Sequence, residues 1–318
     1  MTTKIHPIAA PWGRFHLYSF LIDAPELAIV DTGVTDSAAG MPRALESFGR
    51  RIEDVRWILL THGHIDHVGG AFALWEATGR RAHVVIGERD APFIRSRRAH
   101  VDEFLELRGE YLSDPQAAER KIADAEQSIS GELEPTLLVR GGETLDLGGV
   151  AVLVHAVPGH TPGAVAYVVE GQGDVFVGDS VQCYGAASGF PGYEDAVGYR
   201  KSLEYLRDVV EPRHLYLGHP YRRADGTPFP VELDEAEASE AIQGSLDNEA
   251  RIRAAVERYL AAGLAATDSP YSPFQAVAEE LGYTGDPTLE PAPFFTTMHA
   301  YRTTFPPRSG RTKGERHG

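Results

Sequence analysis

The sequence predicts an α/β (α+β) protein, because short apolar strands alternate with segments whose apolar residues recur at helical spacing. This alternation occurs twice along the chain, which indicates two β-rich halves. The 318 residues are enough for one large domain, or for a domain with an appended part. Apolar residues make up 42% and charged residues 24%, as in ordinary folded proteins.

The first half is expected to consist of strands that lead into helices. The turn-prone Asp23-Ala24-Pro25 separates two short apolar runs, and Gly69-Gly70 stands where a helix begins. The elements expected here are a hairpin of Phe15–Ile22 with Leu27–Asp31, a helix at Ser37–Phe48, a strand at Val55–Thr61, a helix to about Thr78 and a strand at His83–Gly87.

Residues 92–130 differ from their surroundings because they are charged and rich in Arg and Glu. Their spacing predicts a helical insertion of two helices, broken near Asp114-Pro115. We expect one domain over residues 1–233, a helical C-terminal extension over 234–305 and a disordered tail over 306–318. The later elements expected are strands at Val150–Val157, Ala164–Glu170, Asp174–Val177 and Leu215–Leu217, and helices at Ala196–Val209, Asp234–Ala262, Phe274–Leu281 and Phe295–Thr304.

The overall charge argues against a polyanionic partner. The chain carries 30 basic and 46 acidic residues, a formal net charge of −16, so neither nucleic acid nor an anionic membrane surface is expected to bind. No stretch reaches the roughly 18 apolar residues of a membrane span, and the N-terminus lacks a signal-peptide pattern. A single cysteine, Cys183, excludes an intrachain disulfide. These features predict a soluble, cytoplasmic protein.

Four candidate metal ligands stand close together after a predicted strand. The run Thr61-His62-Gly63-His64-Ile65-Asp66-His67 contains three imidazoles and one carboxylate. Zn²⁺ binds histidine nitrogen at about 2.0–2.1 Å and carboxylate oxygen at about 2.0–2.2 Å. A lone histidine is usually structural or exposed, whereas this spacing at a strand end indicates a metal site.

Three later positions provide the remaining ligand candidates. His160, Asp179 and His219 each follow a predicted strand, and each has a glycine beside it. Glycine permits the tight backbone that exposes a neighbouring polar side chain. Each position is a weak signal when taken alone, but together and in this order they are a strong one.

The ordered set resembles the metal-binding motifs of the metallo-β-lactamase superfamily, and Asp31-Thr32-Gly33 matches the first motif of that family. The resemblance spans about Leu27 to Tyr221 and implies a four-layer αββα sandwich with two metal ions in a cleft between its sheets. It also implies that two zinc ions are bound, although iron or manganese would accept the same ligands. One metal would be held by His62, His64 and His160, the other by Asp66, His67 and His219, with Asp179 bridging both.

Several residues are candidates for roles beside the metals. Asp66 is both a ligand and a plausible proton acceptor, and the hydroxyls of Tyr184 and Tyr221 are candidate donors to an oxyanion, with aromatic packing as the alternative. By resemblance Asp31 orients a ligand, but an aspartate in a turn after a strand fits equally. His83 and His155 lie inside predicted strands and are not expected to bind metal. Two basic clusters are candidates for binding a substrate anion or are simply solvated: Arg95, Arg97 and Arg98, and Arg222-Arg223.

The resemblance implies a binuclear metal-dependent hydrolase, because two adjacent metals make hydroxide available near neutral pH and polarise a carbonyl. We expect a small acyl substrate, namely a thioester, lactone or ester, attacked by a metal-bound hydroxide, in the manner of glyoxalase II-like and lactonase relatives. The alternatives are a nuclease or phosphodiesterase of the same superfamily, which the net charge disfavours, and a β-lactamase, which would normally be exported. Neither the substrate nor the oligomeric state follows from the sequence.

The insertion is expected to be a cap over the metal cleft that contributes substrate selectivity. Its length exceeds that of an ordinary connection in a compact domain. Its apolar residues could form a wall, and its arginines could meet a substrate anion. The alternative is a surface excursion packed on outer helices. The wall candidates are Phe93, Ile94, Phe104, Leu105 and Leu107.

Overall fold

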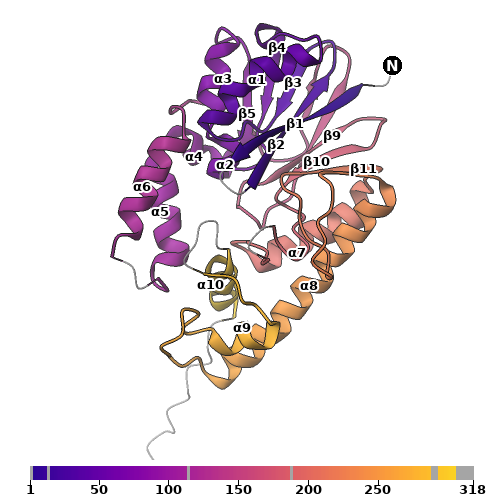
Figure 1. The fold of residues 1–318 in the computed structure, drawn as a ribbon. Helices are drawn as coiled ribbons and strands as arrows, with labels where there is room; N and C mark the ends of the chain where they lie inside the picture. The colour runs from indigo at the N-terminus through magenta and orange to yellow at the C-terminus, as the bar shows by residue number, and fades with distance from the viewer. Residues whose placement is uncertain (1–2, 13–14, 113–114, 187–188, 288–292, 306–318) are drawn as a thin grey trace, which may run out of the picture.

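The computed structural model describes residues 3–12, 15–112, 115–186, 189–287 and 293–305. The expected disordered tail over 306–318 and the expected helix break at Asp114 therefore lie outside the described residues. Two six-stranded sheets form the centre of the fold, and helices cover their outer faces (Figure 1).

The first sheet contains the strands that precede residue 140, in the order β1-β2-β3-β4-β5-β6. β1, β2 and β3 pair antiparallel, whereas β3 to β6 run parallel. The bounds are Lys4–Trp12 for β1, Phe15–Asp23 for β2, Leu27–Val30 for β3, Val55–Leu59 for β4, His83–Gly87 for β5 and Leu137–Val139 for β6.

The second sheet has the order β12-β11-β10-β9-β8-β7 and is antiparallel except for the parallel pair β10 and β11. Its strands are β7 at Thr144–Asp146, β8 at Ala151–Ala156, β9 at Val165–Val169, β10 at Asp174–Gly178, β11 at His214–Leu217 and β12 at Glu232–Leu233. The expected strands of this half match β8, β9, β10 and β11 to within one or two residues.

The helices of the sandwich lie on the outer faces of the sheets, and further helices form the insertion and the C-terminal extension (Figure 1). The helices of the first half are α1 at Thr35–Ser47, α2 at Ile65–Val68 and α3 at Ala71–Ala77. The helices of the insertion are α4 at Ala91–Arg95, α5 at Arg97–Phe104 and α6 at Ala117–Ser128. The later helices are α7 at Ala196–Tyr205, α8 at Glu235–Ala262, α9 at Gln275–Leu281 and α10 at Phe294–Thr304. The expectation of two helices in the insertion is wrong, because α4 forms as well.

Strand β3 shows how the layers arise from the sequence. Its side chains alternate between the two faces of the sheet, as the pleat requires. Ala28 and Val30 pack between the two sheets, with Tyr167 of the second sheet. Leu27 and Ile29 face the opposite way, into a core that includes residues of α1 and α3. Because the outer face of the second sheet packs in the same manner on α7 and α8, the predicted four-layer αββα sandwich is confirmed.

Strand β1 was absent from the sequence expectations, and its composition explains why. Pro7 and Pro11 lack the N–H that a central strand needs, so they count against a strand. The structure places β1 at the edge of its sheet, where one side of the strand needs no partner.

The insertion packs on the C-terminal extension. The hydroxyl of Tyr111 lies 3.0 Å from Nδ1 of His299, and its ring stacks on Phe295 with centroids 5.2 Å apart. Arg302 of α10 forms an ion pair with Glu110. The insertion and the C-terminal extension therefore contact each other below the sandwich in the view of Figure 1. The division of the chain at residues 233 and 234 into domain and extension stays a prediction.

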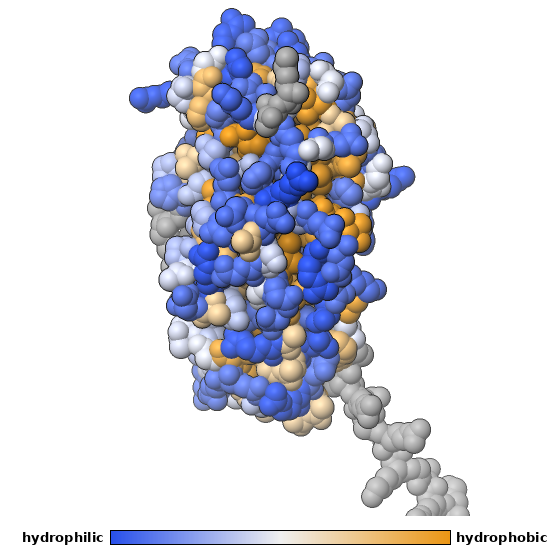
Figure 2. Space-filling model, turned by 90° about the vertical axis from the view of Figure 1, so that its right-hand side faces the viewer, coloured by the Kyte–Doolittle hydropathy of each residue, from blue (hydrophilic) through white to orange (hydrophobic). Residues whose placement is uncertain are grey.

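The surface shown in Figure 2 is mostly hydrophilic, with apolar residues lying between polar ones. Among the described residues no helix is both long and apolar enough to cross a membrane.

Candidate metal centre

The loop after β4 carries four of the predicted ligands, and its conformation depends on close packing. The backbone N–H of Thr61 donates to Oδ1 of Asp31 at 2.8 Å, which fixes the start of the loop. A Cβ added to Gly63 would lie 2.4 Å from the ring of Phe93, so only glycine fits there. Helix α2 begins directly afterwards and carries Asp66 and His67.

Asp31 lies behind this loop and contacts a predicted ligand. Its Oδ2 accepts hydrogen bonds from Nδ1 of His67 and from Oγ1 of Thr61, both at 2.8 Å. Asp31 has a positive φ of 56°, a conformation that aspartate tolerates better than most residues. The resemblance implied that Asp31 orients a ligand, and the structure places it in contact with one.

The other three predicted ligands arrive on loops that follow strands of the second sheet. The glycine before each of them lies against neighbouring atoms. A Cβ at Gly159 would lie 2.2 Å from the backbone of Tyr199, and one at Gly218 would lie 2.3 Å from Asp179. Gly178 has a φ of 51°. The expectation that glycine is needed beside each ligand is confirmed for these positions.

The fold brings all seven predicted ligands together in three overlapping groups. His62, His64 and His160 form one group, Asp66, His67 and His219 form another, and Asp179 joins His62 and His67 in a third. Within each group the candidate ligand atoms lie within 4.8 Å of one another. The carboxylate of Asp179 lies 3.3 Å from Nε2 of His67, 3.7 Å from that of His160 and 3.5 Å from that of His219.

In three of the predicted histidine ligands the protein contacts Nδ1, which leaves Nε2 available to a metal ion. Nδ1 of His62 lies 3.1 Å from Thr61, that of His67 bonds Asp31, and that of His160 bonds the carbonyl of Gly192 at 2.7 Å. Nε2 of each of these histidines is buried without a hydrogen-bond partner, and so is Oδ1 of Asp179. Buried polar atoms without partners are costly, and a metal ion is the partner that histidine and carboxylate atoms share. The residues therefore fit a metal ion.

Burial and neighbouring charges separate the protonation states of these groups. Burial and the nearby histidines hold the pKa of His62 well below its usual value, and burial lowers the pKa of His160 to about 3. Burial would raise the pKa of Asp66, but His67 and His219 outweigh it and lower the pKa. His62, His160 and Asp66 thus have the neutral imidazole and ionised carboxylate forms that bind metal ions. Burial would lower the pKa of His67 and of His219, but Asp179 outweighs it and raises both.

Two residues that support the ligand loops were not predicted. Asp90 is fully buried, and its carboxylate accepts from the N–H of Gly63, the hydroxyl of Thr161 and the N–H of Gly163. It thereby joins the His62–His67 loop to the loop of His160. Gln182 is also buried, and its side-chain amide donates to the carbonyl oxygens of Asp179 and Gly192. Neither residue lies in a motif, so the only sequence signal for Asp90 was its position just after a strand.

Two glutamates that contact a predicted ligand were also missed. Oε1 of Glu103, on α5 of the insertion, lies 3.8 Å from Nε2 of His64, and Oε1 of Glu194 lies 3.9 Å from the same nitrogen. Burial would raise the pKa of Glu103, but His64 and Arg108 lower it to about 2, whereas burial and Glu103 raise the pKa of Glu194 to about 8. The insertion therefore reaches the predicted metal site through a carboxylate.

The two predicted tyrosines have different surroundings. Tyr221 is buried, and its pKa is raised well above the usual value by burial and by the neighbouring carboxylate of Asp179. Tyr184 is partly buried, and Arg251 lies over its ring at 5.7 Å. Their catalytic roles stay predictions, although the contact of Tyr221 favours positioning of Asp179. His83 and His155 lie outside the ligand groups of the described residues, as expected.

The arginines of the insertion make local contacts. Arg95 pairs with Glu134, Arg98 pairs with Asp102, and Arg97 donates to the carbonyl oxygen of Ile129. Phe104 is buried beside Arg108 and Lys121, and Leu105 is 36% exposed. None of these contacts favours the expected apolar wall or an anion site on the insertion.

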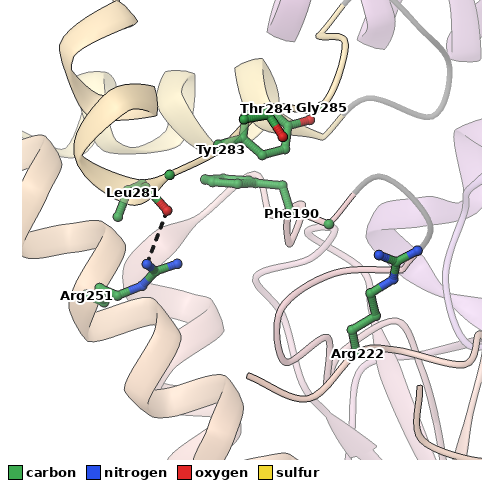
Figure 3. A pocket seen from close by; sticks show the side chains of 9 residues that line it. Phe190, Arg222, Arg251, Leu281, Tyr283, Thr284 and Gly285 are labelled. Atoms are coloured by element: carbon green, nitrogen blue, oxygen red, sulfur yellow. Dashed lines mark hydrogen bonds between the residues drawn. The ribbon is translucent and has the colours of Figure 1, made fainter. Parts of the chain in front are cut away.

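Arg222 borders a pocket of about 310 Å³ between residues 189–190, helix α8 and residues 281–285 (Figure 3). Arg251 of α8 lines the same pocket and donates to the carbonyl oxygen of Leu281 at 3.3 Å. The rings of Phe190 and Tyr283 pack against each other beside it, with centroids 4.9 Å apart. The pocket thus combines two guanidinium groups with an apolar wall.

Comparison with known proteins gives a family and a fold. The family model described as metallo-beta-lactamase superfamily matches residues 12–219. The uncharacterized protein YobT of Bacillus subtilis (strain 168) is 30% identical over 214 residues, which cover 61% of this chain and 78% of that protein. A hydroxyacylglutathione hydrolase of Bradyrhizobium sp. (strain ORS 278) is 28% identical over 238 residues, covering 75% and 74%. A solved metallo-beta-lactamase family protein of Thermus thermophilus superposes with a TM-score of 0.66 at 22% identity, covering 95% and 93% of the two chains, and so shares the fold.

Proposed function

The chain belongs to the metallo-β-lactamase superfamily and is a metallo-hydrolase, and we propose that it hydrolyses a small acyl substrate, a thioester in particular, with two metal ions. The proposed ions are zinc, with iron or manganese as substitutes that the same nitrogen and oxygen ligands accept.

One observation carries the proposal. Seven side chains from four separate loops converge in two ligand groups with Asp179 between them, and four of their inward atoms are buried without a hydrogen-bond partner. His62, His64 and His160 would hold one ion, and Asp66, His67 and His219 would hold the other. When bound, two adjacent ions lower the pKa of a water molecule and polarise an acyl carbonyl.

The chain's own residues prepare the reaction in three ways. Asp31 holds His67 in the tautomer whose Nε2 is free, and Gly192 does the same for His160. Asp66, whose side chain retains 16% exposure, is the carboxylate to which we assign the proton of an attacking water. Tyr221 is buried beside Asp179 and is placed to position its carboxylate.

Two features support a thioester that carries carboxylates. Relatives named hydroxyacylglutathione hydrolase are 27–29% identical to this chain, and the glutathione portion of such a thioester is anionic. The pocket lined by Arg222 and Arg251 combines positive charge with aromatic surface, and Arg222 follows the ligand His219 by three residues. The net charge of −16 argues instead against RNA as the substrate.

The test is a substrate panel on metal-loaded protein. The panel contains a hydroxyacyl thioester of glutathione, an acyl thioester without carboxylates, an acyl lactone, a β-lactam and RNA. His160→Ala serves as the control without a complete metal site. We expect turnover of thioesters, with the glutathione thioester the better substrate, and none by His160→Ala. Turnover of RNA only, or of the β-lactam only, would refute the proposal that the substrate is a thioester.

The role of the pocket is tested separately with Arg251→Met, which removes the charge and keeps much of the side-chain length. It should raise KM for the glutathione thioester more than for the thioester without carboxylates. Equal changes for both substrates would exclude the pocket as the site that binds the anionic portion.

A further inference from the structure

We propose that Glu103 and Glu194 are positioning residues for the metal ligand His64, so that the helical insertion is part of the metal centre. This inference rests on the proposed metal centre, and it concerns two carboxylates that belong to neither of the ligand groups named for the two ions.

The first step concerns which nitrogen of His64 faces the metal. In His62, His67 and His160 the nitrogen Nδ1 is engaged by the protein, and Nε2 is left for the ion. His64 is arranged in the opposite way, because both carboxylates face its Nε2. Its ring stands nearly perpendicular to those of His62 and His160, with centroids 4.9 and 4.5 Å apart. Nδ1 is therefore the nitrogen of His64 that remains for a metal ion.

The second step concerns the carboxylates. Oε1 of Glu103 and Oε1 of Glu194 are both buried, and neither has a hydrogen-bond partner. They flank the outer nitrogen of His64 at 3.8 and 3.9 Å, so a small rotation of one side chain, or one bridging water, completes a hydrogen bond from Nε2–H. Such a bond fixes the tautomer and the ring orientation of a metal-bound histidine and makes it a stronger ligand.

The third step concerns how firmly the two carboxylates are held. At the start of the insertion, the ring of Phe93 packs against Gly63, the residue between His62 and His64. Nε2 of His100 on α5 contacts the carbonyl oxygen of Phe93 at 2.9 Å. The backbone N–H of Glu194 donates at 2.8 Å to Gly159, which directly precedes the ligand His160. Both glutamates are thus tied to the loops that carry the ligands of the first ion.

Charge balance makes Glu103 the principal partner. Arg108 and Lys121, both from the insertion, lie over the ring of Phe104, the residue after Glu103, at 5.2 and 5.6 Å from the ring centroid. A buried carboxylate without such cations would be expensive. The insertion therefore supplies both the carboxylate and two cationic side chains near it.

The experiment measures metal binding rather than turnover. Wild type, Glu103→Gln, Glu194→Gln and His64→Ala are stripped of metal, and zinc affinity is measured by competition with a chelator. Cobalt(II) absorption spectra then report the ligand geometry of each site. Glu106→Gln is the matched control, because Glu106 lies two residues after the end of α5 and is exposed. Thermal unfolding of the metal-free proteins identifies any variant that is merely unstable.

We expect wild type and Glu106→Gln to bind two equivalents alike. Glu103→Gln should weaken one equivalent by about 10–100-fold and alter the cobalt spectrum, while the other equivalent is retained. Glu194→Gln should weaken the same equivalent less. If both glutamine variants bind both equivalents of zinc as wild type does, the inference is wrong. If wild type binds a third equivalent of zinc that both glutamine variants lose, the two glutamates form a separate cation site and the inference is overturned. If wild type binds no metal, or His64→Ala binds as wild type does, the proposed metal centre itself fails.

Discussion

Asp31 offers the sharpest test of how the metal ligands are held. Its carboxylate accepts three hydrogen bonds of 2.8 Å, two of them at Oδ2 from His67 and Thr61. In Asp31→Asn, the amide oxygen can still accept from the N–H of Thr61. Its NH₂ group then meets the N–H of His67, a donor facing a donor. Asparagine tolerates the positive φ of this position as well as aspartate does, so the backbone is not strained.

The size of the effect follows from two independent ranges. A hydrogen bond to a charged group contributes about 1.5–3 kcal/mol, and loss of an outer partner of a metal-bound histidine lowers metal affinity by about 10–100-fold, or about 1.4–2.7 kcal/mol. Because Thr61 also contacts Nδ1 of His62 at 3.1 Å, the substitution disturbs a ligand of each proposed ion.

The assay is chelator competition with zinc, followed by unfolding of the metal-free protein in urea. Asp36→Asn is the control, because Asp36 is exposed in the first turn of α1. We expect weaker metal binding only in Asp31→Asn, together with a loss of about 1.5–3 kcal/mol in the free energy of unfolding. Wild-type metal affinity in Asp31→Asn would refute the reasoning.

Three further predictions follow from the same structure. Asp179→Asn should lower both metal content and turnover, because its carboxylate faces ligands of both proposed ions; unchanged metal content by elemental analysis would contradict this. Burial lowers the pKa of His100 to about 4, whereas in the unfolded chain the pKa is about 6.5. The buried neutral imidazole therefore stabilises the fold above about pH 6.5, and this stabilisation is lost as the pH falls toward about 4. Between pH 7 and 5 the free energy of unfolding, measured by urea titration, should fall by about 2 kcal/mol more in wild type than in His100→Gln. An equal fall in both proteins would exclude His100 as the cause. RNA should bind weakly at physiological salt, as measured by fluorescence anisotropy, because the net charge is −16; tight binding that weakens steeply with added salt would favour the nuclease alternative.

The structure also separates local from distant determinants of the fold. β5 has the bounds that the apolar run predicted, because a buried parallel strand is apolar throughout and is visible in a short window. β6, β7 and β12 were missed, since two or three residues are too few to show a period. The turn of π-helix at Leu105–Gly109 likewise has no periodic signature.

The sequence by itself determined the ligand candidates of the centre, because metal binding requires particular side chains at strand ends and leaves them at recognisable spacings with adjacent glycines. The order of layers followed from the resemblance of these motifs to the metallo-β-lactamase superfamily and not from the apolar pattern, because strands such as β3 are buried on both faces. Only the tertiary structure decided which groups support those ligands. Glu103 and Asp90 lie far along the chain from the ligand loop that they contact, and Gln182 lies outside any motif, so their roles arise from contacts between segments. Such contacts leave no pattern in a local window, because the chain can bring a supporting carboxylate to the centre from any segment that the fold places beside it.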